Sequence, residues 1–375
     1  MALNAAFTLT ANEIYETLAN MIISQEVFAD NLGEHQNLVD KARVDGGLYG
    51  DTKLYYATDV LKSHDWLNDA EAANLLAIER PLDPEVQAIK LDVFKQIRLT
   101  LDNYLTKRAW MNEGAFSSFN GVMLGWMRET KKVYDGTLYN VFIGTTESSV
   151  GEQDQSIVLP AADGTIETSK VRAMEVARQI ADLFDAMSDY NRDFNDYGYF
   201  RSYSRDAIKV IWNKKYLNEI RKVDLPAIFH KDGLIEKFEA DSLNERYFGT
   251  PIAADVSAAN NDGHYRSLVE MDIGAGASRP DGSATASAGT AAQHVFPGDL
   301  IPAGVAIAKG TAYEVDPKVI CKVLVKLPPF MSAFEVGTTF FNPRSLSENH
   351  YLTFGHNSLA YLKNYPFVTV KEVNE

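Results

Sequence analysis

Cysteine is almost absent from this sequence of 375 residues. The single cysteine, Cys321, excludes a disulfide framework and a cysteine-based metal site by count alone. It lies inside the apolar stretch 319–325, and a free cysteine in such a setting is typically a small buried hydrophobe. We therefore predict that Cys321 is buried and that strand structure surrounds it, over residues 319–327.

Long hydrophobic runs are also missing. No apolar stretch approaches the roughly 18 residues that a membrane-spanning helix requires, and no secretory hydrophobic region follows Met1. We expect a soluble chain, made in a reducing compartment and not exported by a signal, with no membrane among its partners.

Positive charge is in short supply. Lys and Arg number 36 against 51 Asp and Glu, so the net charge is −15 at pH 7. A dedicated nucleic-acid-binding protein needs a basic face that displaces counterions from phosphates, and this balance argues against one. The hydrophobic fraction of 46% is normal for a globular protein, and the length predicts two or three lobes.

Motifs that carry chemistry are missing as well. The seven histidines are scattered: His35, His64, His230, His264, His294, His350 and His356. None pairs with another His or Cys at metal-ligand spacing, and for His350 and His356 a structural role is favoured over a metal site. There is no G-x-S-x-G elbow, Walker loop or dinucleotide fingerprint. We predict no catalytic, cofactor-binding or metal-binding residues.

A group of carboxylates admits a sharper interpretation. Asp182, Asp185 and Asp189 lie at i, i+3 and i+7 in the C-terminal half of a predicted helix, where the helix dipole disfavours negative charge. We interpret them as a solvated or subunit-facing acidic stripe. A divalent-metal site is the alternative.

An aromatic cluster follows that helix. Its members are Tyr190, Phe194, Tyr197, Tyr199, Phe200 and Tyr203. Such rings can stack on nucleic-acid bases, but only Arg192, Arg201 and Arg205 accompany them. Packing in a core or at an interface is therefore the preferred interpretation.

The stretch 168–234 predicts a compact α+β nucleus. Six apolar residues at helical spacing predict the first helix, which Thr168 or Ser169 would cap: Val171, Met174, Ala177, Ile180, Phe184 and Met187. The β-branched segment 207–212 then predicts a buried strand. Residues 213–215 turn the chain into a second helical segment.

The N-terminal part predicts extended structure after a first helix. The capping box at 10–13 begins that helix, and the polar, glycine-rich stretch 35–58 predicts a mobile excursion. A short helical piece is expected over 68–78. Alternating residues over 89–101 predict a strand of about 40 Å, at about 3.3 Å per residue, with a bulge near Phe94 and Lys95. A strand of this length predicts one arm of a long hairpin.

A second long helix follows. Its apolar stripe is Phe116, Phe119, Met123, Trp126 or Met127, Thr130 and Val133. Asp135 and Gly136 are expected to end or interrupt it. Beyond it, the Gly/Ala/Ser-rich stretch 274–292 predicts a long loop or inserted tip, and further strands are expected over 304–308, 351–354 and 367–370.

Three passages carry a resemblance to a known family. Residues 99–109 lead into the helical passage 119–129, residues 204–213 are followed by 214–220 and 225–229, and residues 341–344 precede 351–356. In this order they resemble the Johnson fold of tailed-bacteriophage major capsid proteins of the Hong Kong type. The resemblance implies an α+β fold with an N-terminal arm, an extended β-hairpin loop, a long spine helix, a peripheral domain and an axial domain.

The resemblance also implies domain boundaries. They are 1–45 for the arm, 46–103 for the extended loop, 104–215 for the spine helix and peripheral domain, 216–317 for the axial domain and 318–375 for the return strands. Some members of the family crosslink through a Lys and an Asn. Lys53 lies in the expected loop, but no Asn partner can be named, so we predict no crosslink. Because the arm helix begins near Met1, we expect a separate scaffold protein or none.

The implied function is self-assembly into an icosahedral shell, built from pentamers and hexamers, that encloses a phage genome. Such a shell would enclose double-stranded DNA without tight sequence-specific binding, and portal, scaffold or decoration proteins would be further partners. It would be assembled in the host cytoplasm and form the virion capsid. An encapsulin-like nanocompartment shell is one alternative. An α+β enzyme with residues 274–292 as a lid is another.

Overall fold

A computed structural model describes residues 38–47, 51–65, 78, 80–102, 113–222, 241–273 and 293–374. Of residues 113–124, 220–222, 334 and 374 it describes the backbone alone. Contacts within the chain divide it into two compact units. Unit 1 comprises Met1–Asp51, Lys90–Gly136 and Phe330–Ser358, and unit 2 comprises Thr52–Ile89, Thr137–Pro329 and Leu359–Glu375.

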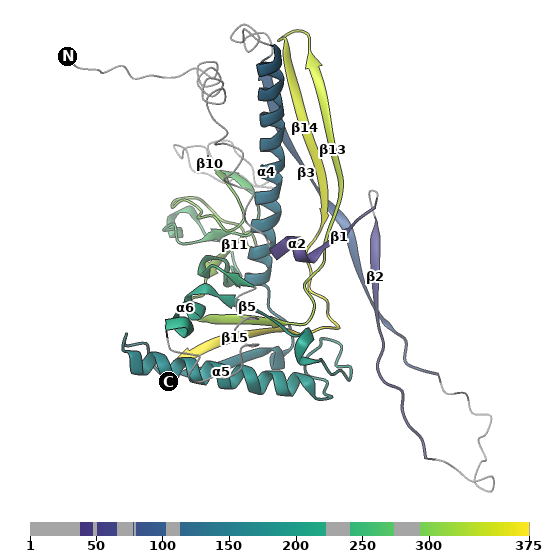
Figure 1. Ribbon diagram of the computed structural model, residues 1–375, viewed down its shortest axis with the longest axis vertical. Coiled ribbons are helices and arrows are strands. Elements are labelled where there is room, and N and C mark those ends of the chain that lie inside the picture. The colour runs from purple at the N-terminus through teal and green to yellow at the C-terminus, as the bar shows by residue number, and fades with distance from the viewer. Residues whose placement is uncertain are drawn as a thin grey trace. The chain divides into compact units, whose positions relative to one another are not determined.

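Unit 1 is built from a helix and long strands. Its elements are α2 (Leu38–Ala42), β1 (Arg43–Asp45), most of β3 (Glu85–Asp102), the first part of α4 (Glu113–Thr145), β13 (Phe330–Asn342) and β14 (Ser347–Asn357). The strands lie in one sheet of order β1-β13-β14-β3-β2, which β2 (Thr52–Ala57) completes. The β13–β14 hairpin runs beside the first part of α4 (Figure 1).

The predicted strand over 89–101 is confirmed, and it extends to the 18 residues of β3. β3 pairs antiparallel with β14, which lies between β3 and β13. The predicted bulge falls instead at Asp92, which the pairing with β14 skips. The Asp92 carboxylate accepts hydrogen bonds from the backbone N–H (2.6 Å) and hydroxyl (2.7 Å) of Ser358. These bonds give the unpaired residue partners outside the ladder.

The stretch 35–58 is extended in part, as predicted. Where the structure describes it, the chain forms the short helix α2 and the strands β1 and β2. Leu38, Val39 and Ala42 of α2 are buried. β1 pairs in parallel with the first residues of β13. The pairing of β1 with β13 joins residues that are far apart in the sequence, so the local content of glycine and polar residues could not predict it.

The predicted end of the long helix at Asp135 and Gly136 is wrong, because α4 continues to Thr145. Asp135 is 1% exposed, and its carboxylate binds Lys131 one turn earlier (3.3 Å) and Arg43 of β1 (3.4 Å). A glycine in a helix interior costs roughly 1 kcal/mol relative to alanine. The buried residues of the last part of the helix, among them Tyr139, outweigh that cost.

The predicted apolar stripe of α4 left a choice between Trp126 and Met127, and the structure decides it. Met127 is buried, whereas Trp126 is 51% exposed. The buried face continues with Lys131 and Tyr134, at i+4 and i+7 from Met127. Phe116, Phe119 and Met123 lie among the side chains outside the described residues.

Unit 2 is centred on a second five-stranded sheet. Its order is β4 (Asp154–Leu159), β15 (Phe367–Asn374), β12 (Val319–Leu324), β5 (Lys209–Asn213) and β6 (Ser242–Leu243). The helices α5 (Ile166–Ser188) and α6 (Lys214–Lys222) accompany the sheet, and α5 runs along it (Figure 1). All six β12 residues are buried, including Cys321, as predicted. The α+β nucleus predicted over 168–234 is confirmed as far as residue 222.

The predicted face of α5 is partly wrong. Val171 and Met174, expected in the core, are 52% and 50% exposed. The predicted burial of Ile180 and Met187 is confirmed, but the rest of the buried stripe uses neighbouring positions: Arg172, Ala173, Val176 and Leu183. The helix begins one turn earlier than expected, and its cap is Thr165, whose side chain accepts from the N–H of Thr168 (3.3 Å).

Smaller sheets complete unit 2. β11 (Ala312–Val315) pairs with β7 (Gly249–Pro251) and β8 (Arg266–Ser267), and β9 (Met271–Ile273) pairs with β10 (Gln293–Val295). The strand predicted over 304–308 is wrong, because Val305 and Ile307 form only isolated bridges, that of Ile307 being with Val256. Single-turn 3₁₀ helices are η2 (Gly151–Gln153), η3 (Arg205–Ala207), η5 (Glu245–Tyr247) and η6 (Ala258–Asn260).

One glycine in unit 2 is required by close packing. A Cβ on Gly144, near the end of α4, would lie 2.0 Å from the carbonyl oxygen of Tyr247. Backbone cannot yield as a flexible side chain does, so this approach of α4 to η5 needs glycine.

Several predicted features lie outside the described residues: the N-terminal helix from 10–13, the helical piece over 68–78 and the loop 274–292. The last of these is bracketed by the paired strands β9 and β10. The domain boundaries that the resemblance implies stay predictions.

Candidate functional site

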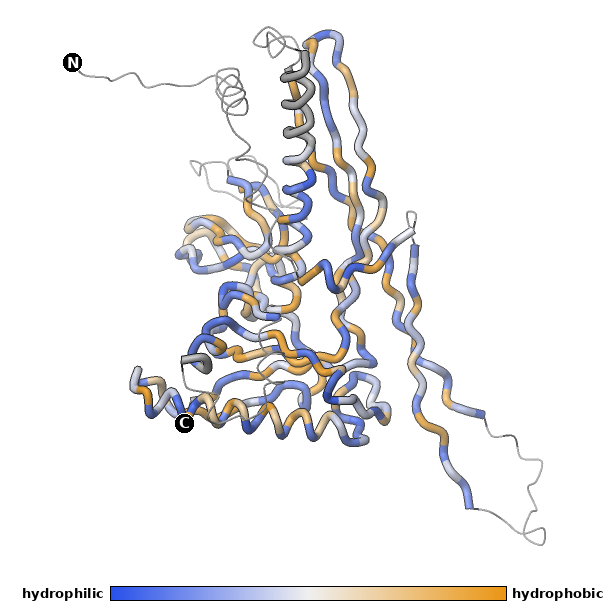
Figure 2. Tube along the Cα trace, viewed as in Figure 1, coloured by the Kyte–Doolittle hydropathy of each residue, from blue (hydrophilic) through white to orange (hydrophobic). Residues whose placement is uncertain are grey.

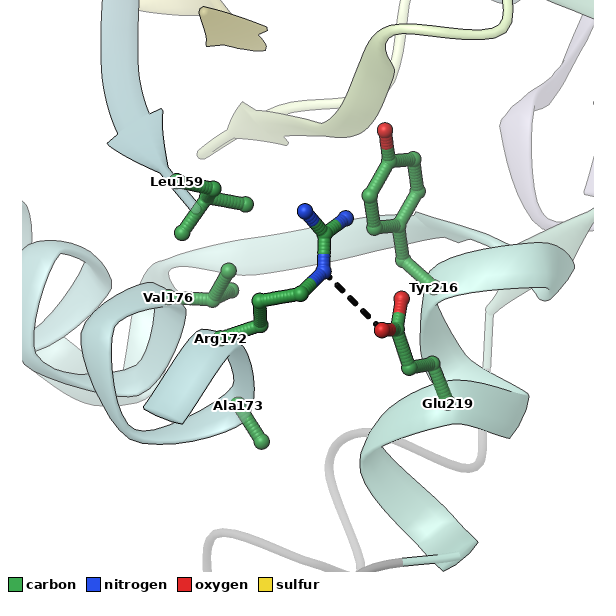
Figure 3. A pocket seen from close by; sticks show the side chains of 6 residues that line it. All are labelled: Leu159, Arg172, Ala173, Val176, Tyr216 and Glu219. Carbon is green, nitrogen blue, oxygen red and sulfur yellow. Dashed lines mark hydrogen bonds and ion pairs between the residues drawn. The ribbon is translucent and has the colours of Figure 1, made fainter. Parts of the chain in front are cut away.

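A buried arginine joins four segments of unit 2, and Figure 3 shows its contact with Glu219. Arg172 of α5 is 4% exposed. Its Nη1 and Nη2 donate to the two carboxylate oxygens of Glu372 on β15 at 3.0 and 2.9 Å, and its Nε donates to Glu219 on α6 at 2.9 Å. Nη1 also donates to the Pro160 carbonyl after β4 (2.6 Å), and the Tyr216 hydroxyl of α6 donates to Glu372 (2.5 Å). The guanidinium is thus satisfied in a bidentate arrangement.

The protonation states follow from these contacts. Burial would raise the pKa of Glu372, but the hydrogen bonds from Arg172 and Tyr216 outweigh it and hold that pKa below its usual range. Burial, followed by the bond to Glu372, raises the pKa of Tyr216. The cluster therefore holds a carboxylate, a guanidinium and a neutral phenol, each already engaged. None of the three has the character of an activated base or nucleophile.

The space beside this cluster is small. A cavity of about 10 Å³ is lined by Leu159, Arg172, Ala173, Val176, Tyr216 and Glu219. A single water molecule needs roughly that volume. The cluster is therefore suited to clamping α5, α6, β4 and β15 together rather than to binding a substrate.

Unit 2 also contains a buried lysine. Lys322 of β12 is 1% exposed, and its Nζ donates to the Thr146 carbonyl and the Thr369 hydroxyl, both at 2.8 Å. Burial lowers the pKa of Lys322 to about 7. Both hydrogen-bond acceptors are uncharged, so the lysine carries a charge that burial disfavours near neutral pH.

The polar contacts of unit 1 gather between α4 and the sheet. Lys131 binds Asp135 and also Glu335 of β13, both at 3.3 Å. One turn away, the Tyr134 hydroxyl lies 2.9 Å from Nε2 of His356, whose ring stacks on Phe330. Burial lowers the pKa of His356. These contacts fasten the long helix to the hairpin.

The histidines that the structure describes do not converge on a metal site. His294 lies between Asp272 (2.6 Å) and Glu270 (3.0 Å), which face opposite ring nitrogens and so cannot share one ion. His264 contacts Asp262. Neither ring nitrogen of His350 has a hydrogen-bond partner among the described residues, and its Nε2 lies 4.0 Å from a carboxylate oxygen of Glu348. Within the described ranges, no three His, Cys, Asp or Glu side chains are placed to hold a metal.

The acidic stripe is solvated, as predicted. Asp182, Asp185 and Asp189 are exposed. Asp182 pairs with Arg178 (3.2 Å), and Asp185 pairs with Arg205. Arginine partners make this stripe an ordinary surface network.

The aromatic cluster is divided between core and surface. Phe194 and Tyr203 belong to the core of unit 2, whereas Tyr190 is 77% exposed and Phe200 is 38% exposed. Arg192 lies over the Phe200 ring at 4.0 Å. Core packing is confirmed for the two buried members.

The same arginine holds the chain beyond β2. Arg192 donates to the Asp59 carboxylate at 2.8 Å, and the N–H of Phe200 donates to the same carboxylate at 3.1 Å. Arg201 donates to the Thr58 carbonyl at 2.5 Å. The hydrogen bond from Arg192 is the main cause that lowers the pKa of Asp59. The contacts, all within unit 2, hold Thr58 and Asp59 just beyond β2. Lys53 lies on β2.

Exposed apolar side chains gather in three places. On and near β2 and the start of β3 they are Leu54, Tyr56, Val60, Leu61, Ile78, Leu82 and Val86. On α5 they are Ile166, Val171 and Met174, and on the β13–β14 hairpin they are Val336, Phe340, Phe341 and Leu346. Figure 2 shows apolar segments along both strands of that hairpin. The sequence predicted none of β13, so this last surface was missed.

The described part of the chain contains no helix long and apolar enough to cross a bilayer. No protein-family model matches the sequence, and no curated protein matches it.

Solved structures do match. A chain in the capsid structure of Staphylococcus phage Andhra superposes with a TM-score of 0.58 over 93% of this chain and 88% of its own, at 10% identity. The chain has this capsid fold. A chain in the structure of the head fiber and inner core protein of native bacteriophage P68 matches with a TM-score of 0.56 at 10% identity, over 89% and 84% of the two chains. The predicted α+β capsid fold is confirmed.

Proposed function

We propose that the chain is a structural major capsid protein that self-assembles into the icosahedral shell of a tailed phage. The observation that carries this proposal is the capsid fold, shared over 93% of the chain with the Andhra structure. Pentamers and hexamers would form the shell of the virion, around double-stranded DNA held without sequence-specific contacts. A net charge of −15 suits a container that should release its nucleic acid.

The surface of the subunit supports the same role. Apolar side chains are exposed along β2, the start of β3 and β13. Such exposed apolar surface would lower the solubility of a monomer. The described residues offer fastening clusters such as Arg172–Glu372 but no substrate-sized cavity around them. The capsid fold supports a structural role, and we propose residues 1–45 as arm and 46–103 as extended loop. Portal, scaffold or decoration proteins would be secondary partners.

Electron microscopy of the purified protein tests the proposal. We expect closed particles tens of nanometres across, with subunits in rings of five and six. Double-stranded DNA in particles purified from infected cells distinguishes a phage shell from an encapsulin-like compartment with a protein cargo. A monodisperse monomer at every concentration and salt would overturn the proposal.

Limited trypsin digestion tests the extended loop. Arg43 is paired with Asp40 and Asp135, and Lys53 lies within β2, whereas Lys62 is exposed beyond the Asp59 contacts. We therefore expect the first cut in unassembled protein at Lys62. The same bond should be protected in shells. Equal cleavage in both states would show that this loop takes no part in assembly.

A further inference from the structure

The outer part of β13 has a free edge. β1 pairs with β13 only at Phe330, Met331 and Ser332. Beyond that point, no strand among the described residues lies on the side of β13 opposite β14. Residues 335–341 are all exposed, so neither face of this segment is covered.

The pairing pattern shows which backbone groups point outward. The Ser332 carbonyl accepts a bond from the N–H of Gly46, so Ser332 directs its backbone away from β14. Successive residues of an antiparallel ladder alternate sides, and β13 carries one extra residue between Ala333 and Val336. Val336, Thr338 and Phe340 therefore bond to β14. Gly337, Thr339 and Phe341 direct their N–H and C=O groups to the free edge.

This edge lacks the usual protection. Natural edge strands carry lysine, proline or an inward charge that discourages pairing. Residues 336–342 contain no charged residue and no proline. An edge left unprotected over this length is suited to receiving another strand.

The three outward residues are symmetric about Thr339. Antiparallel pairing of β13 with the same strand of a second copy would place Thr339 opposite Thr339 and Gly337 opposite Phe341. Threonine pairs and aromatic rings over cross-strand glycines are both favourable. Shifting the register by one pair in either direction leaves an outward residue unmatched. Self-pairing thus satisfies the whole free edge.

We propose that residues 337–341 of β13 form a two-fold β-sheet contact with the same residues of a second copy, centred on Thr339. Such a contact is isologous, because the same surface serves both partners. It rests on the proposed shell function, which brings the copies together. The contact would cover the exposed Phe340 and Phe341 rings that the subunit alone leaves in water.

A cysteine scan of assembled particles tests the contact. Residues paired across such strands have Cα atoms about 5.5 Å apart, within the roughly 4.4–6.8 Å that a disulfide spans. Oxidised Thr339→Cys particles should run mainly as covalent dimers on non-reducing gels. In the matched Val336→Cys variant the two cysteines would be about 20 Å apart, six residues at about 3.4 Å each, and no dimer is expected. Cys321 is fully buried and adds no background.

The outcomes separate the two proposals. Particles of Thr339→Cys that stay monomeric on the gel overturn the β13 contact and leave the shell function standing. Wild-type protein that forms no particles overturns the shell function itself. As a second measurement, Thr339→Lys should lower particle yield at least tenfold while the melting temperature of the unassembled subunit stays unchanged, and Thr339→Ser should assemble normally. Wild-type yield from Thr339→Lys would also overturn the contact.

Discussion

Strands β12 and β13 follow one another in the chain but differ in their burial and in their strand pairing. All six residues of β12 are buried, and Cys321–Leu324 pair on both sides, with β15 and β5. Residues 336–341 of β13 are exposed and, among the described residues, paired on one side only. β12 is complete within the subunit, whereas the outer part of β13 leaves one edge without a strand partner among the described residues. The proposed contact places assembly on β13 and leaves the stability of unit 2 to β12, so each can be altered without the other.

Matched phenylalanines give the largest contrast. Phe354 of β14 is 2% exposed and Phe340 of β13 is 60% exposed. Phe354→Ala should lower the free energy of unfolding of the unassembled subunit by about 3–5 kcal/mol, because it empties a packed site. Phe340→Ala should change it by less than about 0.5 kcal/mol. Urea unfolding checks both variants, and an equal loss in the two would erase the distinction between core and edge.

Ion pairs offer a second contrast, within unit 2. Arg172→Ala leaves Glu372 buried without its partner and should cost about 3–5 kcal/mol of unfolding free energy. Arg178 pairs with Glu175 and Asp182 in solvent, so Arg178→Ala should cost about 0–1 kcal/mol. Thermal melting of both variants measures the difference. A mild effect at Arg172 would mean that the cluster is not the clamp that its geometry indicates.

The buried lysine of β12 predicts a pH dependence. The pKa of Lys322 is about 7 in the folded chain against 10.5 when solvated, so between these values the unfolded state binds more protons. Stability should therefore rise with pH from 7 toward 10, by up to about 1.4 kcal/mol per pH unit. Lys322→Met should flatten this rise. Urea unfolding at several pH values checks it, and an unchanged slope in the variant would assign the effect elsewhere.

A smaller pH effect is expected in unit 1. The pKa of His356 is lowered from 6.5 by burial. Below pH 6.5 the unfolded state takes up a proton that the folded state resists, so stability should fall on acidification. The loss should stay below about 1.4 kcal/mol per pH unit, and His356→Gln should reduce it. Melting temperatures between pH 7 and 5 measure the effect, and parallel curves for the two proteins would exclude His356.

Local sequence patterns predicted those helices and strands that have one buried and one exposed face. β3 alternates, and α5 and α4 show helical spacing, so their existence followed from the sequence. β13 was missed for a physical reason. Alternation arises when one face of a strand is buried, and the outer part of β13 exposes both.

Long-range contacts explain the remaining errors. The local sequence at Asp135 predicts a helix end, but inside the fold the carboxylate of Asp135 forms ion pairs with Lys131 and Arg43. On α5, the polar residue Arg172 occupies the buried stripe because Glu372, distant in the sequence, binds it. That pairing displaces Val171 to the surface. The Arg172 cluster itself could not be predicted, because no spacing along the chain joins α5 to β15.

The solitary thiol of β12 has a practical consequence. Cys321 is fully buried between β5 and β15, and burial raises the pKa of its thiol. A thiol-reactive dye can therefore label the native chain only when the sheet of unit 2 opens. The labelling rate reports that opening in the unaltered protein, free or in a particle. The labelling rate of Cys321 therefore measures how often the central strand of this sheet becomes accessible in each subunit.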